Sequence, residues 1–204
     1  MNTTEAGRST AEARKAAILR HAVPVFARSG YHATPVTEIA DAAGISQAYV
    51  FRLFGNKLGL FTATLERCFG LIEQALREGA EKALDAPAPQ VLAAMGDSYA
   101  DLIADRDLLM LQVHAQSATD VPEIREAMRR GYASAVTLVH ELSGGTRDQV
   151  QYFMAMGLMC HLITALDLDE VDAPWALTLM NGMTVHGRRE EKTEKAAKAA
   201  KAAN

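Results

Sequence analysis

Residues 37–51 place small, apolar and polar side chains in the order that a helix-turn-helix requires. Ala40 and Ala43 are small enough to let two helices cross closely, and Gly44 allows the sharp turn between them. Ser46 is placed to cap the second helix, whose first turn would then face the base edges of a major groove. The segment therefore predicts contact with duplex DNA.

The first turn of that second helix carries the candidate base contacts Gln47, Ala48 and Tyr49. The Gln47 amide has the donor and the acceptor needed to bond one adenine through two hydrogen bonds. Lys57 follows Asn56 at the start of the next helix, where the ammonium group, free amides and the positive dipole end would bind a backbone phosphate. Such a contact positions a protein on DNA without selecting a sequence.

Apolar residues at steps of three and four predict helices along the chain, and no segment shows the alternation of a strand. A capping box at residues 9–12 predicts a first helix over about residues 10–29, bent at Pro24 and ended by Gly30. The further predicted helices, the first two capped by Thr37 and Ser46, cover residues 37–43, 46–53, 57–84, 91–104, 107–116, 122–143, 147–166 and 174–186. We therefore expect an all-α fold.

Charge is distributed unevenly along this chain of 204 residues, whose net charge is −4. Residues 1–60 carry seven Lys/Arg and four Asp/Glu, residues 61–187 carry eight and eighteen, and residues 188–204 carry six and three. The basic first segment could approach a polyanion while the acidic body is repelled. The same charges also fit two ends that are merely solvated.

The stretch from Ala16 to Leu60 resembles the DNA-binding domain of the TetR family of transcriptional regulators. The matching residues are Ile18, Phe26, Gly30, Tyr31, Thr34, Ile39, Ala40, Ala43, Gly44, Ile45, Ser46, Phe54, Lys57 and Leu60. The resemblance implies a homodimeric repressor that leaves a palindromic operator in double-stranded DNA when a small molecule binds. The residues expected to contact DNA are Thr34, Thr37, Ser46, Gln47, Ala48, Tyr49, Phe51, Arg52 and Lys57.

Two positions depart from the Tyr-x-His-Phe pattern that is usual in this family. Phe51 stands where Tyr is common, and Leu53 replaces the His. Phe51 keeps the ring but lacks the hydroxyl that would bond a phosphate. Arg52 and Tyr49 are the possible substitutes for that bond.

Composition and resemblance together divide the chain into four parts. Residues 1–9 are expected to be a flexible N-terminus, and residues 10–70 a three-helix, helix-turn-helix DNA-binding domain. Residues 71–187 would form a larger helical domain for effector binding and dimerisation, followed by a mobile Ala/Lys-rich tail at 188–204. The tail has no large apolar side chain whose burial could offset its ordering entropy.

Flexible Met and amphipathic Tyr side chains in the acidic body suit the lining of an adaptable apolar pocket, although such residues also occur as plain core. The candidate pocket residues are Met95, Tyr99, Met110, His114, Met128, Tyr132, Met156 and Met159. Their apolar character favours a lipophilic or aromatic effector.

The helix around residues 153–160 is apolar on nearly all sides, as is the segment 175–183, so each is expected to be deeply buried or packed on a second subunit. By resemblance, the helices near 147–166 and 174–186 would pair with their symmetry mates in a homodimer. Two DNA-binding heads would then read an inverted repeat.

Residues 1–15 are polar, and the longest apolar run, 153–160, is shorter than the ~18 residues that span a bilayer. A cytoplasmic protein without membrane contact is therefore expected. The chain has no Gly-rich phosphate loop, nucleophile elbow or H-E-x-x-H motif, so we expect neither an enzyme nor a cofactor.

Three alternatives remain open. A metal sensor could draw its ligands from His114, His140, His161, His186, Cys68 and Cys160, but no pair has the i,i+4 spacing of ligands on one helix face, so no metal site is predicted. A reactive thiol would need an activated cysteine, whereas buried thiols are normally inert. A helical interaction module without DNA binding would explain the departures at Phe51 and Leu53.

Overall fold

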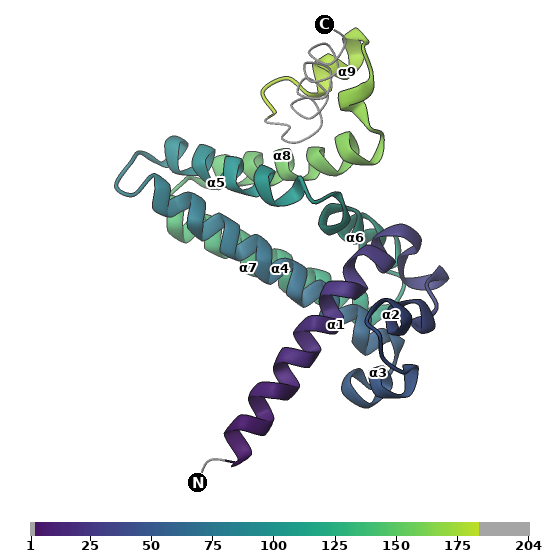
Figure 1. The fold of residues 1–204 in the computed structure, drawn as a ribbon. Coiled ribbons are helices and arrows are strands. Elements are labelled where there is room, and N and C mark those ends of the chain that lie inside the picture. The colour runs from purple at the N-terminus through teal and green to yellow at the C-terminus, as the bar shows by residue number, and fades with distance from the viewer. Residues whose placement is uncertain (1–2, 184–204) are drawn as a thin grey trace, which may run out of the picture. The chain divides into compact units, whose positions relative to one another are not determined.

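The computed structural model describes residues 3–183, which form nine α-helices, one short 3-10 helix and no strand (Figure 1). The helices are α1 (Thr3–Ala33), α2 (Val36–Ala42), α3 (Gln47–Phe54), α4 (Lys57–Lys82), α5 (Ala88–Ile103), α6 (Arg106–Ser117), α7 (Pro122–Ser143), α8 (Arg147–Ala165) and α9 (Pro174–Leu179), with the 3-10 helix η1 (Leu168–Glu170) before α9. The prediction of an all-α fold is confirmed.

The chain divides into two compact units. Unit 1 comprises the residues up to Leu71 together with Asp107–Ala135, and unit 2 comprises Ile72–Arg106 and the residues from Val136 onward. Helices α4 and α7 therefore each contribute residues to both units. The four-part division made from the sequence stays a prediction.

Helix α1 begins at Thr3 and not near Thr10, so the predicted start is wrong and the expected capping box lies inside the helix. Residues 3–9 contain no proline, and their one glycine costs only about 1 kcal/mol of helix propensity. The helix continues through Pro24 and is interrupted at Gly30, whose φ of 68° confirms the predicted left-handed stop.

The two helices of the helix-turn-helix begin differently. Helix α2 starts at Val36 after the extended Pro35, which makes no side-chain cap, so the prediction that Thr37 caps this helix is wrong. The backbone N–H of Glu38 instead donates to the Pro35 carbonyl at 3.2 Å. Helix α3 is capped by Ser46 as predicted.

Helices α5 and α9 depart from the predicted bounds. Helix α5 begins at Ala88, because the prolines on either side of this residue fit the first turn of a helix, where no N–H donor is needed. Helix α9 ends at Leu179, and Gly182 follows with a φ of 76°. The predicted end of that helix at His186 lies outside the described residues.

The core of unit 1 joins the helix-turn-helix to its neighbours. The Phe26 ring of α1 meets the Phe61 ring of α4 edge to face, with centroids 4.8 Å apart. Ile39 of α2 and Val50 of α3 are fully buried. Closely packed apolar side chains leave the helices little freedom to change their crossing angles. These contacts therefore determine the orientation of α3 within unit 1.

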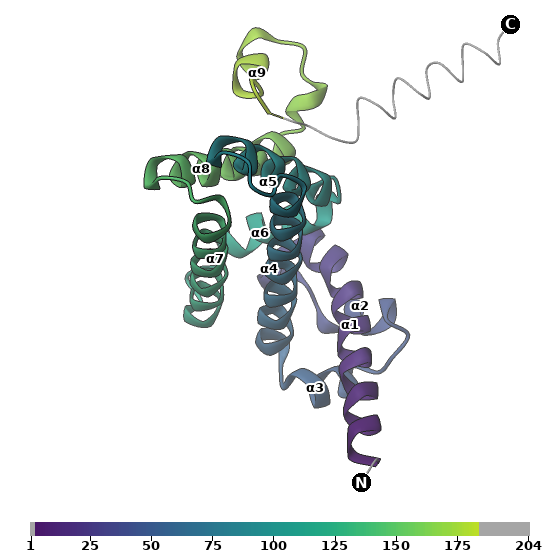
Figure 2. The ribbon, with the colours of Figure 1, turned by 90° about the vertical axis from the view of Figure 1, so that its left-hand side faces the viewer.

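In unit 2, α4 and α5 approach closely at Gly79. A Cβ on this residue would lie 2.6 Å from the Met95 Cα and equally near the Ala94 carbonyl oxygen. Helix α5 also runs beside α8, as Figures 1 and 2 both show. A glycine is therefore required where the backbones of α4 and α5 nearly touch.

We expect Gly79→Ala to lower the free energy of unfolding by about 1–3 kcal/mol, because the added methyl group forces the backbone of α5 to move. The matched control is Gly70→Ala on the same helix, where a Cβ meets no atom within 4 Å. The control should raise stability by about 0.5–1 kcal/mol. Denaturant titration of both variants measures these changes, and equal destabilisation by both would contradict the close approach at Gly79.

Candidate nucleic-acid interface

Backbone hydrogen bonds hold the turn between α2 and α3. The N–H of Gly44 donates to the Asp41 carbonyl at 3.0 Å, and the N–H of Ile45 donates to the Ala40 carbonyl at 2.9 Å. Gly44 has the expected positive φ of 65°, and Ala40 is almost fully buried against the neighbouring helix. The predicted helix-turn-helix is therefore present.

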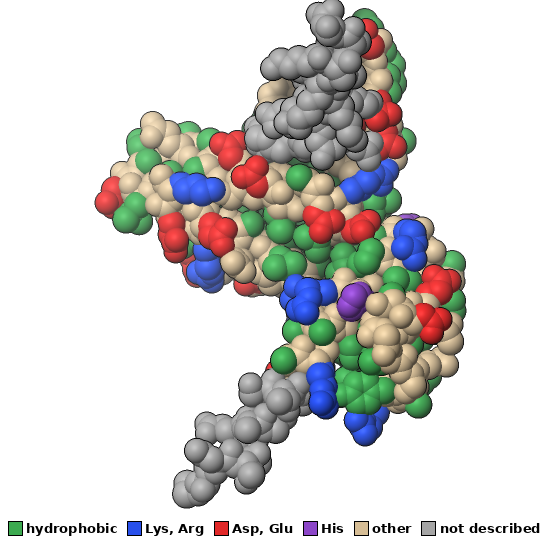
Figure 3. Space-filling model, viewed as in Figure 1, with side chains coloured by type: hydrophobic (Ala, Val, Ile, Leu, Met, Phe, Trp, Pro, Cys, Tyr) green, Lys and Arg blue, Asp and Glu red, His purple; other side chains and the backbone are tan. Residues whose placement is uncertain are grey.

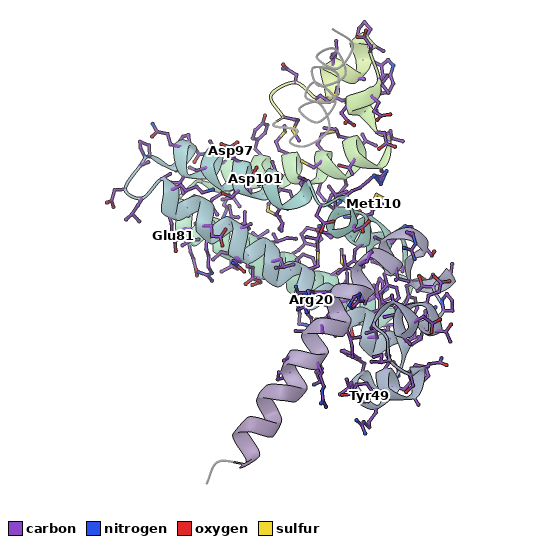
Figure 4. The ribbon with its side chains drawn as sticks, viewed as in Figure 1. Arg20, Tyr49, Glu81, Asp97, Asp101 and Met110 are labelled. Carbon is purple, nitrogen blue, oxygen red and sulfur yellow. The ribbon has the colours of Figure 1, made fainter. Side chains whose placement is uncertain are left out.

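The Ser46 cap fixes the first turn of α3. Its Oγ accepts the backbone N–H of Tyr49 at 3.2 Å. Gln47 and Ala48 are exposed, as is Arg52 one turn further on, and Tyr49 is half-buried. Figure 4 shows Tyr49 projecting from α3. The structure thus brings these predicted contacts together on one surface, to which Phe51, 37% exposed, adds an apolar ring.

Thr34 and Thr37 occupy different environments. Thr34 is fully buried, and its hydroxyl donates to the Gly30 carbonyl at 2.7 Å. Thr37 is exposed on α2. Because the Thr34 hydroxyl holds the turn between α1 and α2, we do not assign it to the DNA-contacting surface.

Lys57 is bound within the protein. Its ammonium group donates to the His32 carbonyl at 3.0 Å and lies 5.1 Å from the centroid of the Tyr31 ring. Burial lowers the pKa of Lys57 from its ordinary value. The cap of this helix is Asn56, whose Oδ1 accepts the N–H of Gly59 at 2.8 Å. Lys57 therefore ties the start of α4 to the end of α1, and a phosphate contact by Lys57 stays a prediction.

Arg14 of α1 is a further residue at this surface that was not predicted from the sequence. A side-chain hydrogen bond from Arg14 is the main cause that lowers the pKa of the Tyr49 phenol, and Arg52 acts in the same direction. The Arg52 guanidinium also lies over the Tyr49 ring, 4.6 Å from its centroid. The only sequence signal for Arg14 was the basic charge of residues 1–60, because no motif links residues so far apart in the chain.

The eight predicted pocket residues fall into two groups of four. Met110, His114, Met128 and Tyr132 belong to unit 1, whereas Met95, Tyr99, Met156 and Met159 belong to unit 2. Met95 and Met128 are buried, and the other six are half-buried. The structure therefore does not assign all eight to one unit, and their role in a pocket stays a prediction.

Two of these residues have structural contacts in unit 1. The Tyr132 ring packs on the Phe69 ring with centroids 5.5 Å apart, and its hydroxyl accepts a hydrogen bond from Gln116 Nε2 at 3.1 Å. His114 lies against Gly30, where a Cβ would be only 2.9 Å from His114 Nδ1. His114 thus connects α6 to the end of α1.

The residues proposed for metal binding or thiol chemistry lie in other settings. Between residues 3 and 183 no three His, Cys, Asp or Glu side chains come together as a metal site, and His186 lies beyond that part. Cys68 is buried, with its thiol 3.5 Å from the Leu108 carbonyl oxygen. Burial raises the pKa of Cys160 to about 11, which disfavours the reactive thiolate.

His161 of α8 is 7% exposed. This burial lowers the pKa of its imidazole to about 4, so the side chain is neutral at physiological pH. The same helix also presents apolar side chains on its exposed face.

Within the described residues, no helix has the length and apolar character needed to cross a membrane.

Comparison with known proteins agrees with this geometry. Residues 18–64 match the family described as bacterial regulatory proteins, tetR family. The HTH-type transcriptional activator FasR of Mycolicibacterium smegmatis is 35% identical over 72 residues, which are 35% of this chain and 33% of FasR. This chain therefore spans about a third of the length of that relative.

Solved structures share the fold over most of the chain. The fatty acid degradation regulator FadR from Bacillus halodurans has a TM-score of 0.64 at 19% identity, covering 83% of this chain and 95% of FadR. FadR from Bacillus subtilis in complex with stearoyl-CoA has a TM-score of 0.61 at 21% identity, covering 81% and 92%.

The fold and the exposed first turn of α3 define a helical protein with a helix-turn-helix of the DNA-binding type. The match over residues 18–64 identifies this segment as the family's N-terminal domain. Residues 18–64 therefore form a domain of the tetR family of bacterial regulatory proteins.

We expect Gln47→Ala to relax discrimination at one or two base pairs of a bound duplex, because an exposed amide at this position has the donor and acceptor that a base edge requires. Ala42→Ser, at an exposed position of α2 outside the predicted contacts, is the control for a general disturbance of the helix-turn-helix. Binding to a set of single-base variants of one duplex measures the effect. An equal loss at every base pair would contradict the assignment of Gln47.

The free energy of unfolding is expected to fall as the pH is lowered from about 6.5 to about 4. In this window the unfolded chain protonates His161 and the folded chain does not, so acid favours unfolding by up to roughly 3 kcal/mol. His161→Gln should remove this contribution, whereas His140→Gln at an exposed site on α7 should retain it. Unfolding measured across this pH range checks the difference, and identical pH profiles for the two variants would refute it.

Proposed function

We propose that this protein is a homodimeric, sequence-specific transcriptional repressor that is released from a palindromic operator by a small lipophilic or aromatic effector. The observation that supports this function best is the first turn of α3. Ser46 caps that turn, and the buried Val50 anchors the helix so that the Gln47 side chain is exposed. This arrangement suits base reading in a major groove.

The charge of the two units supports DNA contact by unit 1. Its described residues carry eleven Lys/Arg and nine Asp/Glu, whereas those of unit 2 carry four and thirteen, a net charge of −9. Acidic side chains are visible over α5 in Figure 3, and Figure 4 labels Asp97 and Asp101 on this helix. A duplex is therefore repelled by unit 2 and accepted by unit 1.

The exposed face of α8 supports a homodimer. Tyr152, Leu158, Leu162 and Leu166 are 68%, 47%, 42% and 55% exposed. At 100° per residue these side chains, including that of the C-cap Leu166, fall within about one third of the helix circumference, so they form a continuous apolar stripe. Trp175 of α9 is also 54% exposed. A second copy of the chain would cover this surface, as expected for helices near 147–166 and 174–186.

The likeness to FadR from Bacillus subtilis, whose structure contains stearoyl-CoA, favours a long acyl chain among the lipophilic effectors. An acyl chain would suit Met-rich apolar surroundings. The CoA group carries several negative charges, and the described residues of unit 2 offer only four Lys/Arg to receive them, against thirteen Asp/Glu. We therefore propose that the acyl chain, more than the CoA group, is the recognised part.

A second candidate function is transcriptional activation, which the similarity to the transcriptional activator FasR favours. In either case the role is binding without enzymatic turnover, and we propose that it is exercised in the cytoplasm. A reporter gene behind the selected operator separates the two, since loss of the protein raises expression for a repressor and lowers it for an activator.

The test is selection of bound sequences from a random duplex library with the purified protein at a stated salt concentration. We expect an inverted repeat to emerge, because two identical heads read two half-sites. The matched control is Leu162→Lys, which places a charge in the apolar stripe and should leave only half-site enrichment. Stearoyl-CoA or stearate added to the complex should release the selected duplex. Failure to enrich any sequence would refute DNA recognition, and a non-repeated site would refute the dimer.

A further inference from the structure

We propose that Arg14 of α1 and Arg52 of α3 form, together with the Tyr49 hydroxyl, a clamp for one DNA backbone phosphate. This inference rests on the proposed function and assigns Tyr49 to the DNA backbone instead of to a base edge. It also makes α1 part of the DNA-contacting surface, although the helix-turn-helix motif itself contains only α2 and α3.

Two elements supply the clamp. The Arg52 guanidinium lies 4.6 Å from the centroid of the Tyr49 ring. Arg14 of α1 acts on the same phenol, because its side-chain hydrogen bond is the largest cause that lowers the pKa of Tyr49. Both arginines are exposed, and among the described side chains, those of residues 12–183, no carboxylate oxygen lies within 4.0 Å of either guanidinium. Two positive charges thus converge on one phenol without a neutralising partner.

The hydrogen-bonding chemistry leaves a donor free for an anion. A guanidinium has only donors, so Arg14 and Arg52 can bond only to the lone pairs of the Tyr49 oxygen. The flanking cations lower the pKa of this phenol, which makes its proton a stronger hydrogen-bond donor. The O–H of Tyr49 and the remaining N–H groups of both arginines can therefore donate hydrogen bonds to the oxygens of one phosphate.

The clamp accounts for the departures at Phe51 and Leu53. Phe51 has no hydroxyl, and Leu53 is a half-buried apolar side chain, so neither can hold a phosphate through a hydrogen bond. Lys57 is engaged with the His32 carbonyl. The two guanidinium groups at Tyr49 offer the contact that these positions lack.

The experiment uses the full-length protein and the duplex selected above, titrated over a range of salt concentrations. Arg14→Gln and Arg52→Gln should each lower affinity for all duplexes alike and reduce the salt slope by about 1. The double variant should lose less than the product of the two single losses, because one phosphate is shared. Tyr49→Phe should weaken binding about fivefold without changing base preference, because the O–H donor is lost while the ring remains.

The control is Arg20→Gln, which removes the same charge from the same helix. Six residues separate Arg20 from Arg14, a rotation of about 240° around the helix, and Figure 4 shows Arg20 well along α1 from Tyr49. This variant should keep the wild-type salt slope. Thermal melting followed by circular dichroism confirms that each variant is folded.

Two results would overturn the clamp while leaving DNA recognition intact. The first is an equal change of the salt slope in Arg14→Gln and Arg20→Gln, which would indicate a general charge effect. The second is a change of base preference at one position in Tyr49→Phe, which would return Tyr49 to base reading. If the wild-type protein binds no duplex, the proposed function and the clamp fail together.

Discussion

The left-handed turn at Gly30 is the constraint on which unit 1 depends. A side chain at this position would strain the backbone and collide with the His114 ring. The carbonyl of Gly30 accepts a hydrogen bond from the buried Thr34 hydroxyl. The carbonyl of His32, two residues further on, accepts one from the Lys57 ammonium group. One turn thereby joins the end of α1 to α2, α4 and α6.

Because α1 is held in this way, the recognition helix is supported by packing on several sides. The Phe26 and Phe61 rings lock α1 to α4, and the buried Val50 anchors α3 within the same unit. The polar end of α3 is then exposed without a loss of core contacts. It is also placed beside Arg14, so α1 contributes both to the core and to the charge at the surface.

The acidic half has a different physical organisation. Helices α4 and α5 approach closely because Gly79 has no side chain. Helix α8 buries the neutral His161 on one side and exposes an apolar stripe on another. Helices α4 and α7 contribute to both units.

The sequence by itself determined the all-α class, the glycine stops, the Ser46 cap and the helix-turn-helix, because each depends on residues a few positions apart. It predicted helix starts less well, as at α1 and α2, since several residues there can begin a helix. Only the tertiary structure decided that Thr34 is buried, that Lys57 is tied to a carbonyl 25 residues away, and that Arg14 meets Tyr49. These contacts join distant parts of the chain, and their existence depends on how the helices pack, which no local pattern specifies.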